Sequence, residues 1–111
     1  MEPKIIHYNK LVRDKVIAKL ERLKIYHTFH IANNLEFEEK LFSKIPEEIA
    51  EFLESKGAIE EYIDIKHVLE AWADHRGWTA EYIEQKSKEK LDKEGGLKDR
   101  IILDDCEEKS P

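Results

Sequence analysis

The sequence predicts an all-α protein, a helical bundle of about four helices that follows a short irregular N-terminal arm. Apolar residues recur at intervals of three and four through most of the chain, which is the period of an α-helix. Glycines at positions 57, 77, 95 and 96 divide this pattern into segments. With 111 residues, 41% hydrophobic and 40% charged, the chain has the length and composition of one soluble helical domain, expected over residues 1–111.

The expected helices cover about residues 15–24, 35–54, 58–75 and 79–93. Asn33 and Asn34 offer a cap for the second helix, and Thr79 offers one for the fourth. Pro46 falls inside the second helix, where a proline removes a hydrogen bond and costs ~3 kcal/mol, so we expect a kink or a restart there. A tight turn at Gly57 makes the second and third helices an antiparallel hairpin.

The segments outside the helices are the arm, one connection and the C-terminal end. The arm spans residues 3–14, and residues 26–30 alternate in a way that favours a short extended segment. Beyond the break at Gly95 and Gly96, the apolar residues 101–103 are expected to pack back, whereas residues 104–111 form a polar tail that is expected to be frayed.

Charge and cysteine content exclude several classes of function. The net charge of −6 disfavours a nucleic-acid-binding or anionic-membrane-binding protein. No stretch approaches the ~20 apolar residues that cross a bilayer, and the start of the chain lacks the apolar region of a secretory signal. A single cysteine, Cys106, allows no internal disulfide. We therefore expect a cytoplasmic protein that acts on neither nucleic acid nor membrane.

Two acidic pairs lie on the helices of the predicted hairpin. Glu48 and Glu51 are three residues apart on the second helix, and Glu61 and Asp64 have the same spacing on the third. Side chains three apart share a helix face. Across a short turn the two pairs can face each other beside the apolar seam, where four carboxylates repel one another unless a cation compensates. An all-carboxylate set suits Mg²⁺, with Mn²⁺ possible, better than zinc or copper.

A plainer interpretation of these pairs stays open on spacing alone. The chain has 25 acidic residues, so pairs of acids three apart arise by chance, and most such pairs are solvated helix faces.

The order of motifs resembles that of a known family. Residues 8–15 read YNKLVRDK; a glutamate-rich helix with EEIAEFLE at 47–54 follows, then EEYIDI at 60–65, then a basic helix that ends in Gly-Gly and a short apolar segment. From Tyr8 to Leu103 this order resembles a compact branch of the MazG-like nucleotide pyrophosphohydrolases.

The resemblance implies an all-α enzyme, a homodimer or higher homo-oligomer, that cleaves a nucleoside triphosphate to monophosphate and pyrophosphate in a house-cleaning role. It implies Glu48, Glu51, Glu61 and Asp64 as the metal ligands. Glu47 would be a nearby ligand or water-orienting base, and the general base is open among Glu47, Glu48 and Glu51.

Phosphate groups also need basic partners. Lys10, Arg13 and Lys15 in the arm are candidates, with ordinary surface charge as the alternative. Lys90 and Arg100, near the Gly-Gly turn, are second candidates.

Three positions depart from the family pattern. His67 replaces an acid one turn after Asp64, Glu94 lies beside Gly-Gly where relatives have a basic residue, and Pro46 precedes the metal glutamates by one turn. These changes bear on metal affinity, on phosphate binding by the tail and on the placement of the glutamates. Two alternatives therefore stay open: a phosphoribosyl-ATP pyrophosphohydrolase, and an inert helical dimer that binds a nucleotide or a protein.

Overall fold

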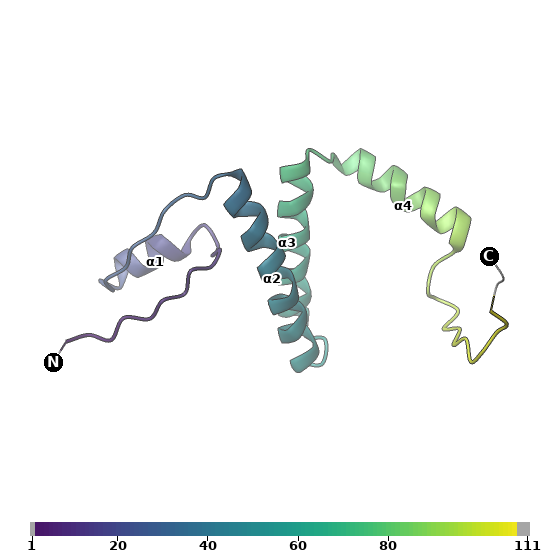
Figure 1. The fold of residues 1–111 in the computed structure, drawn as a ribbon, viewed down its shortest axis with the longest axis horizontal. Helices are drawn as coiled ribbons and strands as arrows, with labels where there is room; N and C mark the ends of the chain where they lie inside the picture. The colour runs from purple at the N-terminus through teal and green to yellow at the C-terminus, as the bar shows by residue number, and fades with distance from the viewer. Residues whose placement is uncertain (1, 109–111) are drawn as a thin grey trace. The chain divides into compact units, whose positions relative to one another are not determined.

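The computed structural model describes residues 2–108 and is all-α. Over these residues it contains four helices and no strand (Figure 1). The helices are α1 Val16–Arg22, α2 Asn34–Glu54, α3 Ile59–Arg76 and α4 Ala80–Glu94. The predicted fold class is confirmed.

The chain forms two compact units, one up to Arg76 and one from Gly77 onward. That residues 1–111 make a single domain stays a prediction. None of the helices in the described part combines the length and the apolar character needed to cross a bilayer. The cytoplasmic location also stays a prediction.

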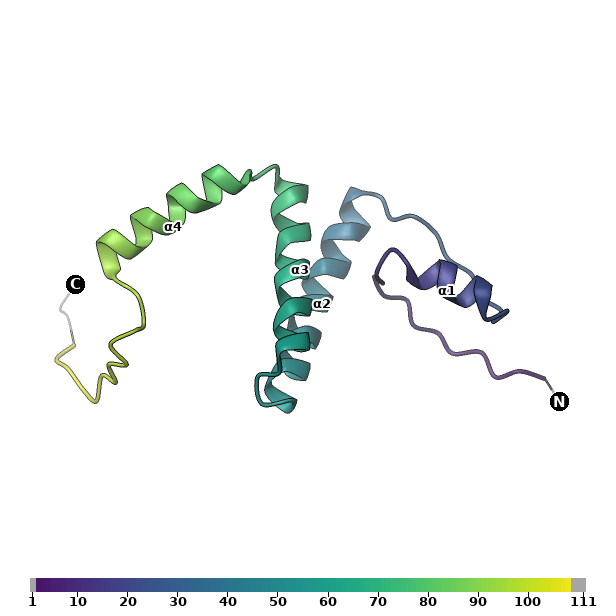
Figure 2. The ribbon, with the colours of Figure 1, turned by 180° about the vertical axis from the view of Figure 1, so that it is seen from behind.

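An antiparallel hairpin of α2 and α3 is the centre of the first unit (Figures 1 and 2). Leu41 is fully buried between these helices, and Val68 and Ala73 are each 8% exposed. Trp72 meets Phe42 across the hairpin with ring centroids 4.7 Å apart. The core is small and lies along one seam.

The turn of the hairpin depends on Gly57, which has a φ of +81° that side-chain-bearing residues rarely adopt. Its N–H donates to the Phe52 carbonyl at 2.8 Å, which ends α2. The Ser55 hydroxyl then accepts from the Ala58 N–H at 3.1 Å and leads into α3. The turn predicted at this point is confirmed.

Helix α2 begins at a side-chain cap and continues through its proline. The Asn33 side chain accepts from the Glu36 N–H at 2.9 Å, as the sequence predicts. The helix then runs without interruption to Glu54 with Pro46 inside it, so the alternative of a restart at Pro46 is wrong. Pro46 supplies no N–H to the preceding turn, and the packing along the hairpin compensates for that missing hydrogen bond.

The arm and the connection around α1 are irregular. Helix α1 is shorter than the predicted segment 15–24, because Lys24 turns the chain with a φ of +55°. Residues 26–30 form no regular secondary structure, so the extended segment expected there does not pair as a strand.

The second unit is α4 followed by an irregular end. Thr79 caps α4 by accepting from the Tyr82 N–H at 3.1 Å, and Gly95 ends it with a φ of +80°. The apolar residues Ile101, Ile102 and Leu103 are 80%, 80% and 74% exposed, so the expected packing of this segment is wrong. Residues 104–108 have no regular structure, and the rest of the predicted frayed tail lies outside the described residues.

Candidate metal centre

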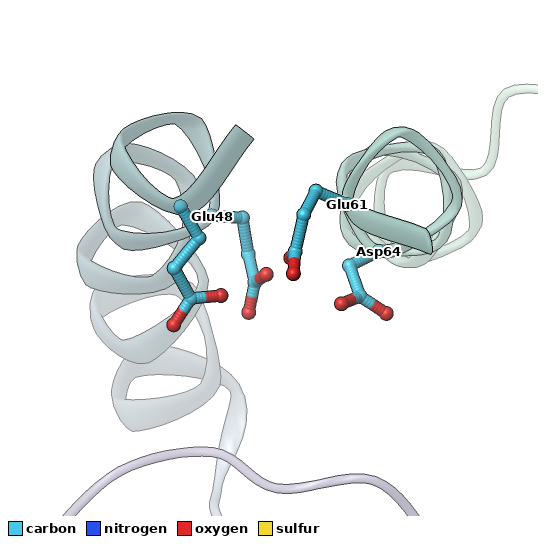
Figure 3. Close-up of side chains that lie close together, drawn as sticks. Glu48, Glu61 and Asp64 are labelled. Atoms are coloured by element: carbon cyan, nitrogen blue, oxygen red, sulfur yellow. The ribbon is translucent and has the colours of Figure 1, made fainter. Parts of the chain in front are cut away.

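Four carboxylates from the two helices of the hairpin meet in one cluster. Each of Glu48, Glu51, Glu61 and Asp64 offers an oxygen, and these four oxygens all lie within 4.8 Å of one another. The labelled side chains in Figure 3 point from α2 and α3 into the space between the helices. The structure thus brings together the set that the sequence singled out, and the set could hold a metal ion.

Local geometry explains the convergence. The three-residue spacing within each helix puts each pair on one face. The turn at residues 55–58 is short, so Glu51 and Glu61 lie at matching heights near the closed end of the hairpin. The cluster is therefore a direct product of two helix faces and one turn.

Glu48 is the most buried member, with 7% of its surface exposed. One of its oxygens, Oε1, lies 3.6 Å from the Lys44 ammonium one turn earlier. The other, Oε2, is buried and has no hydrogen-bond partner. Burial raises the pKa of Glu48 above its usual value, and contact with Glu51 adds to this effect.

Glu61 shows the same pattern from α3. Its Oε2 is also buried without a hydrogen-bond partner. Loss of solvent raises the pKa of Glu61, and the charges of Asp64 and Glu48 raise it further. A buried acceptor without a donor is costly, and a single cation could satisfy both of these oxygens. The donor set is all oxygen, so it fits a hard divalent ion.

Glu47 pairs with the arm. Its Oε1 accepts from the Lys10 ammonium at 2.8 Å. This hydrogen bond lowers the pKa of Glu47 and raises the pKa of Lys10. Glu47 is thus next to the cluster in sequence but is not among its converging oxygens.

Arg13 reaches the cluster itself. It donates to Asp64 Oδ1 at 2.6 Å and contacts His67 Nδ1 at 3.1 Å. A guanidinium can only donate, so His67 Nδ1 accepts and the ring carries its proton on Nε2. Two of the three arm candidates, Lys10 and Arg13, therefore lie at the acidic site.

The remaining candidates are Lys15, Lys90 and Arg100. Lys15 is the N-cap residue of α1 and makes no side-chain capping hydrogen bond. Lys90 pairs with Glu94 on α4, and Arg100 follows in the irregular end of the second unit. Because both belong to the second unit, their role at the carboxylates stays a prediction.

Sequence reasoning missed two contacts that shape the site. Lys44 precedes Glu48 by four residues, a spacing that already indicates an ion pair on a helix. Lys40 donates to the Asn9 carbonyl at 2.7 Å and ties the arm to α2. No sequence pattern indicates a contact between an irregular arm and a helix 31 residues away.

No family model matches the chain, and no curated protein and no solved structure matches it. The resemblance to MazG-like enzymes thus stays a prediction from its motifs.

Proposed function

We propose that this protein is a divalent-metal-dependent nucleotide pyrophosphohydrolase of the MazG-like type, which cleaves a nucleoside triphosphate to a monophosphate and pyrophosphate. One observation carries the proposal: four carboxylates converge within 4.8 Å, and two of their buried oxygens lack a hydrogen-bond partner. Structural carboxylates on a helix surface would find water or a basic partner instead.

The cation would be held by Glu48, Glu51, Glu61 and Asp64, with Mg²⁺ as the first choice and Mn²⁺ as an alternative. When bound, it neutralises phosphate charge and activates a water molecule. Glu48 is the most buried of the four and lacks a partner at Oε2, which suits a fixed ligand.

Other residues of the chain would bind and orient the substrate. Glu47 is next to the cluster in sequence and would accept a proton from the attacking water. Lys10 and Arg13 are the cations that the arm brings to the site, and they would bind phosphate oxygens. That Lys90 and Arg100 bind phosphate stays a prediction from the sequence.

We also infer that the chain works as a homodimer or higher homo-oligomer. Leu35, Phe42 and Ile49 follow one another at seven-residue spacing on α2 and are 67%, 57% and 42% exposed. Tyr62 and Leu69 have the same spacing on α3 and are 55% and 50% exposed. A small chain with so little buried apolar surface gains stability by covering such side chains.

These side chains lie away from the acidic cluster. At about 100° per residue, Ile49 points roughly 100° to 160° around α2 from Glu48 and Glu51. Phe42 contacts Trp72, which is one turn from Leu69, so the stripes of α2 and α3 adjoin. We call the surface of Leu35, Phe42, Ile49, Leu53, Tyr62 and Leu69 the apolar face. A second copy could cover it and leave the carboxylates accessible.

The deciding experiment measures product formation from a panel of ribo-, deoxyribo- and modified nucleoside triphosphates, with Mg²⁺, Mn²⁺ or EDTA. We expect metal-dependent formation of monophosphate and pyrophosphate. Glu61→Gln should lower the rate by on the order of 100-fold or more. Glu60→Gln is the matched control, because Glu60 is a neighbouring exposed acid outside the cluster, and it should keep the rate.

Other outcomes distinguish the alternatives. Turnover of phosphoribosyl-ATP with none of the triphosphates would make the chain a phosphoribosyl-ATP pyrophosphohydrolase. A folded protein with no turnover of either substrate class would be an inert binding protein, and the enzyme proposal would be wrong.

A further inference from the structure

The N-terminal arm is held against the acidic cluster by its basic side chains. We propose that Arg13 is an internal counter-ion of the cluster that competes with a divalent cation for Asp64, so that residues 8–13 form a strap that opens when a cation binds. This inference rests on the proposed metal site. It adds a regulation of that site by the chain's own arm.

Arg13 contacts a carboxylate that belongs to the converging set. Its guanidinium lies 2.6 Å from Asp64 Oδ1, and Asp64 contributes one of the four oxygens of the cluster. A guanidinium and a divalent cation on the same carboxylate repel each other even when they take different oxygens. Cation binding at the cluster therefore weakens the hold of Asp64 on Arg13.

His67 keeps Arg13 in place. It lies three residues after Asp64 on α3, and its Nδ1 contacts the guanidinium at 3.1 Å. The two acceptors share a helix face, so the two ends of the guanidinium are held by Asp64 and His67 together. His67 is thus a positioning residue for Arg13. An acid at this position would instead add a fifth negative charge to the site.

The rest of the strap is fastened to α2 by two contacts. Lys10 donates to Glu47 at 2.8 Å, and Lys40 donates to the Asn9 carbonyl at 2.7 Å. The side chains of Lys10 and Arg13 are 42% and 54% exposed. Ion pairs with this exposure contribute little stability, so the strap can open without unfolding the hairpin.

Opening has a consequence for substrate binding. Once Arg13 leaves Asp64, its donor fork is available to a phosphate group close to the cluster. The strap then makes phosphate binding depend on prior cation binding. We expect an ordered association in which the cation binds first and the nucleotide second.

The first test measures Mn²⁺ affinity by calorimetry, with the full chain and no nucleotide. Arg13→Gln should bind Mn²⁺ about two- to fivefold more tightly than the unaltered chain, the range expected when one exposed ion pair no longer competes. Arg22→Gln is the matched control, because it makes the same charge change on α1 in the same unit. It should leave the affinity unchanged.

A double-mutant cycle isolates the role of His67. His67→Ala should also tighten Mn²⁺ binding, by less than Arg13→Gln, because it loosens Arg13 only. In the Arg13→Gln background the same substitution should have no further effect. An equal effect in both backgrounds would show that His67 does not act through Arg13.

The second test needs no variant. Trypsin cleavage after Lys10 and Arg13 should become several-fold faster when Mn²⁺ is added, with cleavage after Arg22 as the internal reference. Two outcomes would contradict the strap proposal without contradicting the metal site. One is cleavage that Mn²⁺ does not change, and the other is an Arg13→Gln protein that binds Mn²⁺ no more tightly than Arg22→Gln. If none of these proteins bound Mn²⁺, the proposed metal site itself would be wrong.

Discussion

Glu48 combines burial, negative neighbours and an oxygen without a partner. Its Oε2 lacks a hydrogen bond, and the nearest cation, Lys44, is 3.6 Å from the other oxygen. Such a group weakens the hairpin, and under the proposed function it would hold a cation. A bound cation would reverse this effect on stability, so we expect the same side chain to destabilise the free chain and to stabilise the complex.

We predict that Glu48→Gln stabilises the free protein. The change removes repulsion with Glu51 and Asp64 and should raise the free energy of unfolding by roughly 0.5–1 kcal/mol, as measured by urea denaturation in EDTA. The control is Glu54→Gln, an exposed acid on the same helix. Glu48→Gln should also lose the stabilisation that Mg²⁺ is expected to give to the unaltered chain. A Glu48→Gln protein still stabilised by Mg²⁺ would contradict the ligand assignment.

The raised pKa values of Glu48 and Glu61 also predict a pH dependence. Both exceed the usual value of 4.5, so above pH 4.5 these two groups bind more protons in the folded chain than in the unfolded chain. Stability from these groups is therefore fully present below 4.5 and is lost as the pH rises through the folded-state values. Glu47 behaves in the opposite way, because its lowered pKa makes its contribution disappear only below 4.5.

Urea denaturation in EDTA at a series of pH values from 4.5 upward checks this prediction. The free energy of unfolding should fall with rising pH, and a Glu48→Gln, Glu61→Gln double variant should flatten the fall. A double variant with the slope of the unaltered chain would assign the dependence to other groups.

The metal candidates could be predicted from sequence because spacing within a helix fixes which side chains share a face. The helical spacing of Glu61 and Asp64 and the short turn before α3 were enough to predict that these residues lie near Glu48. The partners of Lys10 and Arg13 could not be predicted, because the path of an irregular arm depends on contacts such as that of Lys40 with the Asn9 carbonyl. Glu47 also looked like a member of the cluster, yet it points to Lys10 instead.

At the scale of the elements, α2 carries Pro46 within an unbroken helix, two residues before Glu48. We predict that Pro46→Ala raises the free energy of unfolding by about 1–3 kcal/mol, because it restores the N–H that the Phe42 carbonyl can accept. Urea denaturation measures the change, and Pro3→Ala in the irregular arm is the control that should have no effect. A destabilised Pro46→Ala would show that the proline fixes a bend on which the hairpin packing depends.

Local signals predicted the ends of the elements well where a side chain or a glycine sets them. Asn33 and Thr79 accept the hydrogen bonds expected of helix caps, and Gly57 makes the turn. Where no such residue acts, prediction was weaker. Helix α1 ends at Arg22 because Lys24 adopts a positive φ. A lysine does not favour a positive φ, so the sequence did not indicate this end. The apolar residues 101–103 indicated burial, but hydropathy does not specify a surface to pack against.

At the scale of the whole molecule, apolar side chains are abundant but few are buried within the described chain. Leu41, Val68 and Ala73 form the core, whereas every member of the apolar face is more than 40% exposed. The sequence predicted oligomerisation through a family resemblance. The apolar face supports it independently through side chains whose exposure the sequence did not reveal.

We predict that Leu53→Glu weakens self-association. Leu53 is 67% exposed on the apolar face, and a buried carboxylate there should raise the dimer dissociation constant by about 10- to 100-fold in sedimentation equilibrium. Leu97→Glu is the control, since Leu97 is 94% exposed in the second unit. A chain that sediments as a monomer before any substitution would contradict the oligomer.

The short turn at Gly57 has a consequence for how the protein folds. All four carboxylates lie between residues 48 and 64, so the cluster is built from local contacts, which form early during folding. We therefore expect their mutual repulsion to be present already in the transition state for folding. A divalent cation bound at the cluster would then accelerate folding of the chain at least as much as it slows unfolding, and would act in nucleation as well as in the folded state.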